Sequence, residues 1–515
     1  MFNRKAIDMA VVNGDCRKRL AAISDPTRRQ ILHRRPRSSA KTSAGASGNP
    51  LNQIQRKHSS MSDNNDFSHG SVPRHILSLA VPMTLGQLVQ IAYNLVDRIY
   101  IGHMEGTSSM ALTGLGLTFP IVTIIMAFTN LFGTGGVPLF SIARGKRNAE
   151  AENRYMENTF LMLCISSVAI MLLCYLFMKP VLYLFGASDE SYPYSAEYLK
   201  IYLIGTPFVM LSTGMNGFIN AQGFGKTGMF TILFGAVANI ILDPIFIFAF
   251  DMGIAGAAIA TVLSQLLSAV WVLLFLTGKR ALRRLRIRKA RLHGATILEI
   301  MRLGVAGFIM QASNGAVQIA ANNTLGAYGG DIYIGVMTVL NSVREVVLLP
   351  MQGLSNAAQP VIGYNLGAQK YDRIKAAIRF TTPISAVYAA LCWLLIFLFP
   401  EPIMQLFNAD PELLEKGAPA MHIFFFGFFM MAFHSVGQCV FVGLGKSRQA
   451  VCFSLLRKII VVVPLTLLLP HIGGLGVTGV FVAEPISNFV SGVACFATML
   501  WTVRRLTTAD NRAGA

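Results

Sequence analysis

Apolar and polar residues alternate along this chain in long blocks rather than residue by residue. Twelve mostly apolar stretches follow one another from about residue 73, separated by short polar loops. They lie near 74–101, 111–143, 158–186, 194–222, 227–250, 254–278, 297–325, 332–364, 376–400, 417–442, 449–470 and 475–503. About 20 helical residues span the hydrocarbon core of a bilayer. The pattern therefore predicts an all-α polytopic membrane protein with twelve transmembrane helices.

The distribution of charged residues also predicts how the helices are oriented in the membrane. The chain is 53% hydrophobic, only 13% charged, and has a net charge of +19. Lys and Arg gather in the loops after even-numbered segments, above all in the run 279–291, whereas Asp and Glu occupy the opposite loops. This asymmetry predicts that both termini are cytoplasmic and that the chain lies in the plasma (inner) membrane. Because the positive charge lies in membrane-flanking loops, no nucleic-acid partner is needed to explain it.

The second half of the chain repeats the first. The stretch beginning at Leu79 aligns with that beginning at Leu303, and later blocks align at an offset of about 220 residues. An even number of helices per half makes this a parallel repeat. We therefore predict the following segments: a disordered basic extension at 1–72, or translation from Met61; a first lobe at 73–278; a basic cytoplasmic linker at 279–296; a second lobe at 297–505; and a tail at 506–515.

Polar residues on the first helix form a stripe on one face. Gln87, Gln90, Asn94 and Asp97 are spaced i, i+3, i+7 and i+10. The aligned residues of the second half are Gln311, Asn314, Gln318 and Ala321. The shared polar positions predict a cavity wall, and the carboxylate in the first half alone indicates a cation. A charged group at that depth costs about 2.5–3.5 kcal/mol on insertion scales. The alternative is that Asp97 lies near the helix end and reaches the membrane surface.

A second acidic position occurs on the fifth helix. Asn239 and Asp243 are four residues apart and share a helix face, and Thr261 follows on the sixth helix. None of the three has a polar counterpart in the second half. Two acids in one lobe can share a proton, bind a cation such as Na⁺ together with amide and hydroxyl oxygens, or pair with a basic residue. The alternative is that Asp243, before Pro244, only interrupts the helix.

Other polar residues within the helices indicate a function less clearly. His434 is a further candidate for a cavity in the second lobe, while Arg344, Glu345 and Glu484 are expected to form ion pairs or to face a cavity. The sequence contains no metal-binding cluster, nucleophile motif or cofactor fingerprint. We therefore predict neither an enzyme nor a cofactor other than a coupling H⁺ or Na⁺.

Several motifs occur in an order that resembles a known family. YNLVDRIYIGH, NIILDPIFIF followed by GIAGAAIATVLSQ, and PMQGLSNAAQPVIGYNLGAQKYDRIK are similar to the bacterial side of the MATE (multidrug and toxic compound extrusion) family. The resemblance covers about residues 73–505. It implies two six-helix lobes around a central cavity, alternating access, and drug efflux coupled to H⁺ or Na⁺ entry.

The resemblance also implies roles for residues. It assigns cation or proton coupling to Asp97, Asn239, Asp243 and Thr261, and helix bending to Pro82. Some members have further acids in the second lobe, where this chain has Asn314 near one position and neutral residues or His434 near the other. A second-lobe cation site is therefore not expected.

The sequence is compatible with two transport functions. The first is a monomeric antiporter that exports small organic compounds, cationic or lipophilic, across the lipid bilayer. The alternative is a flippase-like transporter of lipid-linked oligosaccharides, which needs Arg and Lys in its cavity to bind pyrophosphate. Such residues are expected to be scarce inside these helices, which favours the antiporter.

Overall fold

The computed structural model describes residues 66–513 apart from 103–107, 186, 190 and 408–410. The described residues all belong to one structural unit, which begins at Ser59. They form helices and connecting loops, and this described part of the chain has no strand. The all-α prediction is confirmed. The predicted extension up to residue 65, including the alternative start at Met61, lies outside the described residues.

The helices of the first half follow the predicted apolar stretches. They are α3 (Val72–Gly102), α4 (Ser108–Gly145), α5 (Ala149–Leu176), α6 (Met178–Leu184), α7 (Tyr192–Ala221), α8 (Gly225–Pro244), the π-helix η2 (Ile245–Ala249) and α9 (Gly253–Thr277). The linker contains one 3₁₀ turn, η3 (Ile287–Lys289). The short α6 follows α5 after a single residue, so these two elements together correspond to one predicted stretch.

The second half has a similar order of elements. They are α10 (Gly294–Gly329), α11 (Asp331–Gly367), α12 (Tyr371–Leu398), α13 (Pro400–Gln405), α14 (Pro411–Phe425), α15 (Met430–Gly443), α16 (Ser447–Leu455), the π-helix η4 (Leu456–Val462), α17 (Val463–Leu468), the 3₁₀ turn η5 (Leu469–His471) and α18 (Val477–Ala513). Two helices, α14 and α15, take the place of α7, and α17 and η5 are added before the last helix. The short α13 after α12 repeats α6 after α5.

Most of these helices meet the requirements for crossing a membrane. Ten spans in the described part of the chain are long and apolar enough, and α14 with α15 adds an eleventh that is bent by 49°. The bend lies at Gly427, whose φ of +76° is unfavourable for other residues and where a Cβ atom would lie 2.4 Å from the Phe489 ring. With the 30-residue α7, the twelve predicted transmembrane segments all have helical counterparts.

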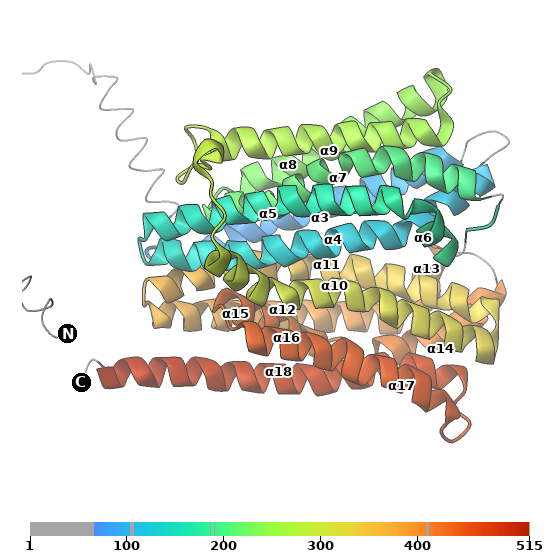
Figure 1. Cartoon of the computed structure of the whole chain (residues 1–515). Coiled ribbons are helices and arrows are strands. Elements are labelled where there is room, and N and C mark those ends of the chain that lie inside the picture. The colour runs from blue at the N-terminus through green and yellow to red at the C-terminus, as the bar shows by residue number, and fades with distance from the viewer. Residues whose placement is uncertain (1–65, 103–107, 186, 190, 408–410, 514–515) are drawn as a thin grey trace, which may run out of the picture. The chain divides into compact units, whose positions relative to one another are not determined.

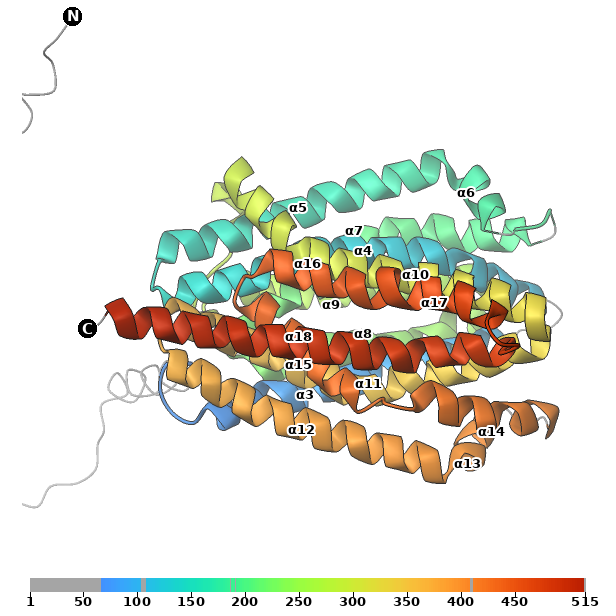
Figure 2. The same ribbon diagram turned by 90° about the horizontal axis from the view of Figure 1, so that it is seen from below.

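Helix contacts repeat between the halves, as the sequence repeat predicts. In the first lobe α3 packs on α8, and α7 packs on α4 and α9; in the second, α10 packs on α16, and α15 packs on α11 and α18. The lobes meet where α4 contacts α10 and α11, and where α3 contacts α11. Figure 1 shows α3 to α9 on one side of this boundary and α10 to α18 on the other. Figure 2 shows α16 and α17 along α10 and α18.

The contact between the lobes depends on small residues. A Cβ atom on Gly304 of α10 would lie 1.7 Å from the carbonyl oxygen of Leu131 on α4. A Cβ atom on Gly145 would lie 1.9 Å from the carbonyl oxygen of Tyr364 on α11. Only glycine allows the helix backbones to approach this closely, as is common where membrane helices pack. These contacts lie in the half of α4 that leads to the basic loop.

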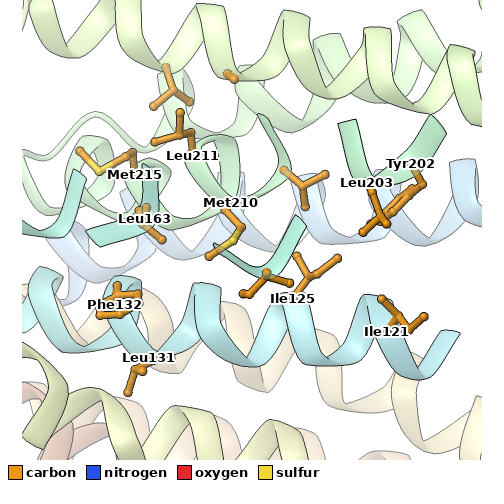
Figure 3. Close-up of a cluster of buried hydrophobic side chains, with 14 of the residues drawn as sticks. Ile121, Ile125, Leu131, Phe132, Leu163, Tyr202, Leu203, Met210, Leu211 and Met215 are labelled. Atoms are coloured by element: carbon orange, nitrogen blue, oxygen red, sulfur yellow. The ribbon is translucent and has the colours of Figure 1, made fainter. Parts of the chain in front are cut away.

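The interior of the first lobe is a cluster of aliphatic and aromatic side chains. Leu163 of α5, Met210 and Met215 of α7, and Ile125 of α4 are among its fully buried members. Figure 3 shows these side chains converging between α4, α5 and α7. The cluster includes Ile300 of α10, so apolar packing continues across the lobe boundary.

Ordered structure continues beyond both predicted ends of the membrane domain. Phe67 lies in the expected extension but is only 1% exposed. Its carbonyl oxygen accepts hydrogen bonds from Asn365 Nδ2 at 3.1 Å and Arg373 Nη2 at 2.8 Å. The aromatic ring and these donors hold the segment just before α3 against the second lobe. At the other end α18 continues through the predicted tail to Ala513, because its last turns contain no proline or glycine.

Candidate functional site

A cavity of about 970 Å³ lies mainly among the helices of the first lobe. Side chains from α3, α4, α7, α8 and α9 line it, and α11 of the second lobe adds Asn356, Gln359 and Pro360. This volume is at the upper end of the range for sites that bury drug-sized molecules. Aliphatic, aromatic and uncharged polar groups are mixed along the wall. The cavity can therefore accommodate a bulky amphipathic compound.

The predicted stripe on α3 faces this cavity in part. Gln87, Gln90 and Asp97 are lining residues, whereas the side chain of Asn94 lies outside the described residues. Pro82 lies inside α3, one residue before Met83, another lining residue. A proline within a helix removes a backbone hydrogen bond and weakens the helix locally. The predicted role of Pro82 in helix bending stays a prediction.

Two of the four predicted coupling residues line the cavity, and the other two are buried in α8. Asp97 of α3 and Thr261 of α9 line it, while Asn239 and Asp243 of α8 are 1% and 0% exposed. Asn239 Nδ2 donates to Asp243 Oδ1 at 2.9 Å. The two carboxylates are close enough for electrostatic repulsion. The helices thus bring together the residues that the sequence singled out.

Two oxygens at this position are available to a ligand. Asp243 Oδ2 and Asn239 Oδ1 are buried, and neither has a hydrogen-bond partner among the described residues. A buried acceptor without a donor costs about 1–3 kcal/mol, so such atoms need an explanation. Oxygen ligands suit Na⁺, and a proton on one carboxylate would supply the missing donor. The residues present fit either coupling ion.

The backbone changes shape directly after this position. Pro244 ends α8, and the chain continues as the π-helix η2. A proline has no N–H to donate to the preceding turn, and π-helical turns are frequent at functional sites. In the second half η4 is also a π-helix, and it lies just before Pro464. At an offset of 220 residues η4 aligns with residues 236–242, so the two π-helical turns lie on opposite sides of the aligned prolines. The proline is common to both halves, while the acid belongs to the first.

Sequence reasoning missed a group of cavity residues with hydroxyl and amide side chains. Tyr93 accepts a hydrogen bond from Gln90 Nε2 at 2.7 Å. On α7, Tyr198 and Tyr202 both line the cavity, and their rings are stacked with centroids 5.8 Å apart. Gln265 of α9 is a further lining residue. Tyr93 is four residues before Asp97, so helical spacing from the acid could have identified it.

The predicted candidates of the second lobe do not line this cavity. Asn314 and Gln318 of α10 line a separate void of about 20 Å³, and Gln311 lines neither. His434 of α15 is buried at 3% exposure. On the face of α10 that repeats the α3 stripe, Gln318 Oε1 accepts a hydrogen bond from Asn341 Nδ2 at 2.9 Å within the same lobe, whereas Asn314 is exposed.

The ionisable residues of the second lobe form a buried cluster. Glu484 of α18 pairs with Arg344 of α11, as expected, whereas Glu345 is exposed. Glu484 also pairs with Arg457 and lies 3.9 Å from Lys458, both of which sequence reasoning overlooked. The expectation that basic residues are scarce inside the helices is therefore wrong for this lobe. None of these cations lines the 970 Å³ cavity.

Comparison with known proteins agrees with this architecture. The MatE family model matches residues 82–245 and again 306–468, which reproduces the internal repeat. The multidrug export protein MepA of Staphylococcus haemolyticus is 26% identical over 431 residues, covering 82% of this chain and 93% of that protein. MepA of Staphylococcus saprophyticus is 24% identical, covering 86% and 96%.

Solved structures show the same fold. A MATE crystal structure in the bent conformation aligns with a TM-score of 0.81 and 23% identity, covering 87% of this chain and 98% of that one. A MOP superfamily transporter from Pyrococcus furiosus aligns with a TM-score of 0.81 and 22% identity, covering 86% and 98%. Together with the repeat and the two-lobed helical fold, the matching family model shows that this chain is a member of the MatE family of membrane transporters.

Proposed function

We propose that this protein is a secondary antiporter of the plasma membrane that exports organic, cationic or lipophilic compounds in exchange for H⁺ or Na⁺. Both termini are cytoplasmic in this proposal, and the monomer is the working unit. The names of the MepA relatives, which are multidrug export proteins, support the export of varied compounds. An exporter also needs a large cavity and an ion site that communicate, and the first-lobe cavity with the acids Asp97 and Asp243 supports this.

The charge of the cavity is the observation on which the proposal depends. Among its described lining residues Asp97 is the charged one, and Lys and Arg are absent from that set. An acidic wall attracts organic cations and repels the pyrophosphate of a lipid-linked sugar. The same acid lies within electrostatic range of Asp243. Substrate and coupling ion can therefore compete for one negative region, which favours the antiporter over the flippase.

Competition between the two ligands supplies a mechanism of exchange. A proton or Na⁺ at Asp243 and Asn239 reduces the negative charge that a cationic substrate meets beside Asp97. Each ligand then weakens binding of the other, as reciprocal coupling between two sites requires. The lobes are in contact in the half that leads to the basic loops. With the predicted orientation that half is cytoplasmic, so the described conformation is closed toward the cytoplasm.

Transport in reconstituted vesicles tests the proposal. Proteoliposomes containing the full chain are loaded with a cationic dye, and a proton gradient or a Na⁺ gradient is imposed separately. We expect one of the gradients to drive dye movement in the wild type. Asp243→Asn is expected to lose this coupled movement, since the neutral amide cannot exchange a proton or neutralise Na⁺.

Asp251→Asn is the matched control, because it makes the same chemical change at an exposed residue shortly after η2. Its positive φ of 52° is tolerated by asparagine. The control should transport like the wild type. Full gradient-driven efflux by folded Asp243→Asn protein would exclude the proposed site, and failure of both gradients to drive wild-type efflux would exclude ion-coupled antiport.

A further inference from the structure

The second lobe contains three basic side chains around one carboxylate, within its packed helices. Glu484 Oε1 lies 2.7 Å from Arg457 Nη2, 3.4 Å from Arg344 Nη1 and 3.9 Å from Lys458 Nζ. Arg457, Lys458 and Glu484 are only 6%, 5% and 4% exposed. The three cations come from α11 and η4, and the acid comes from α18. All three distances end on the same carboxylate oxygen.

The charges of this cluster do not balance. A guanidinium group keeps its charge in proteins, so the two arginines exceed Glu484 by one positive charge even before Lys458 is counted. The other groups that face the cluster are uncharged amides and an aromatic ring on α10, α11, α14 and α18, together with His434 on α15. They include Asn314, Gln318, Asn341, Phe424 and Asn488; the hydroxyl group of Thr466 on α17 and the rings of Phe425 and Phe428 also face the voids and are uncharged too. A buried charge without a counter-charge is strongly unfavourable.

Hydrogen-bond donors in the cluster also outnumber their acceptors. Arg457 Nη2 donates to Glu484 and to Asn488 Oδ1, the latter at 3.2 Å, but Arg457 Nε is buried without a partner among the described residues. Each guanidinium group has five N–H donors. One carboxylate oxygen and one amide oxygen therefore cannot accept from all the donors of two arginines. Additional acceptors are therefore required at this position.

Space for a small acceptor is present beside the cations. One void of about 10 Å³ is lined by Arg344, Arg457 and Glu484. A second, of about 20 Å³, is lined by Arg344, Lys458 and Glu484. Measured in this way, a void of about 10–15 Å³ holds one water molecule. These voids can hold a water or a monatomic ion, but not an organic anion.

We propose that this cluster binds a small monovalent anion of the halide class, such as chloride, in the larger void, between Arg344 and Lys458. The anion supplies the missing negative charge and accepts hydrogen bonds from the two cations that line this void. The site is distinct from the acidic cavity of the first lobe and does not depend on the proposed antiport. In the repeat alignment at an offset of 220, Arg457 and Lys458 correspond to Val237 and Ala238, so the anion site belongs to the second lobe alone.

Direct binding and stabilisation by chloride test this proposal. The purified full chain, exchanged into gluconate at constant ionic strength, is titrated with radiolabelled chloride, and its thermal unfolding midpoint is followed with chloride and bromide. We expect saturable binding of about one chloride per chain and a matching rise in the midpoint, because a ligand of the folded state alone stabilises it. Sulfate is expected to have no saturable effect, since it is too large for either void.

Two substitutions separate anion binding from simple ion pairing. Lys458→Met removes one cation and should weaken chloride binding by more than about tenfold, because charges in contact interact by several kcal/mol at low effective dielectric. Glu484→Gln removes the competing carboxylate and should tighten chloride binding. Arg448→Met, at an exposed residue of α16, is the matched control and should leave binding unchanged.

The competing arrangement is a water-filled cluster in which Lys458 is neutral. It predicts no saturable chloride binding to the wild type, and that result would overturn the proposal. So would equal chloride affinity in the wild type and in Lys458→Met. The wild-type binding measurement stands by itself if Glu484→Gln does not fold.

Discussion

A single methyl group at the lobe boundary is expected to change which conformation the protein prefers. Gly304 packs on α4 so closely that a Cβ atom would lie 1.7 Å from Leu131 O, where ordinary contact begins at 3.4 Å. Backbone atoms on both sides prevent relief by rotation of a side chain. In Gly304→Ala the helices must therefore separate by more than an ångström wherever the lobes are in contact.

The size of this conformational shift can be estimated from the free-energy cost of overpacking. Inserting a methyl group into a well-packed interface costs about 1–3 kcal/mol. If the alternative conformation separates the lobes here, the same energy shifts the equilibrium toward it by about 5- to 150-fold. A protein that populates the alternative at about 3% would then occupy it at about 13% for the smallest shift and at about 80% for the largest.

Pulsed electron paramagnetic resonance can measure this shift. Spin labels at Glu150→Cys and Asp372→Cys, both exposed residues near the lobe boundary, report the separation in a background with the native cysteines replaced by serine. We expect Gly304→Ala to add a longer distance. Gly315→Ala, on the same helix but with no atom within 4 Å of its added methyl, should match the wild type. An unchanged distance distribution in folded Gly304→Ala would refute the reasoning.

Three further predictions concern stability and the ion site. Phe67→Ala should destabilise the protein by about 3–5 kcal/mol because it empties a fully buried position, and thermal unfolding checks this. Burial alone would raise the pKa of Asp66, but hydrogen bonds from Ser68, Tyr364 and His69 outweigh burial and hold that pKa well below its usual range. The stability lost in Asp66→Asn should therefore be constant from pH 5 to 8 and should shrink below about pH 4, as the wild-type carboxylate becomes protonated. Asn239→Ala removes the donor that stabilises the ionised Asp243 carboxylate, together with an oxygen that can bind Na⁺. It should strengthen proton binding or weaken Na⁺ binding by about 5- to 150-fold, measured as the shift in the pH or Na⁺ concentration for half-maximal efflux.

The helices and the acidic residues of the first lobe could be predicted from the sequence. Membrane helices satisfy their backbone hydrogen bonds internally, so apolar length predicts them directly. Polar positions that both halves share can be explained by the scaffold, whereas Asp97, Asn239 and Asp243 occur in the first half alone. Their proximity depends on helices that are adjacent in both halves, namely α3 with α8 and α10 with α16.

Features that depend on the rotation or packing of helices were not predictable in this way. Arg457 and Lys458 lie in an apolar stretch, and their partner Glu484 is on another helix, so nothing in the local pattern joins them. The stripe on α10 matches that on α3 in sequence, but its surroundings in the second lobe are different. Phe67 lies in a polar segment, and its burial depends on contacts with residues some 300 positions away.

The central claim is that substrate and coupling ion bind in competition at the first-lobe site. Its most direct test is the affinity of the purified protein for a cationic dye, measured across pH and across Na⁺ concentration. The proposal predicts that dye affinity of the wild type falls as one of these cations increases, and that Asp243→Asn abolishes the dependence. A wild-type affinity that is independent of both pH and Na⁺ would contradict it.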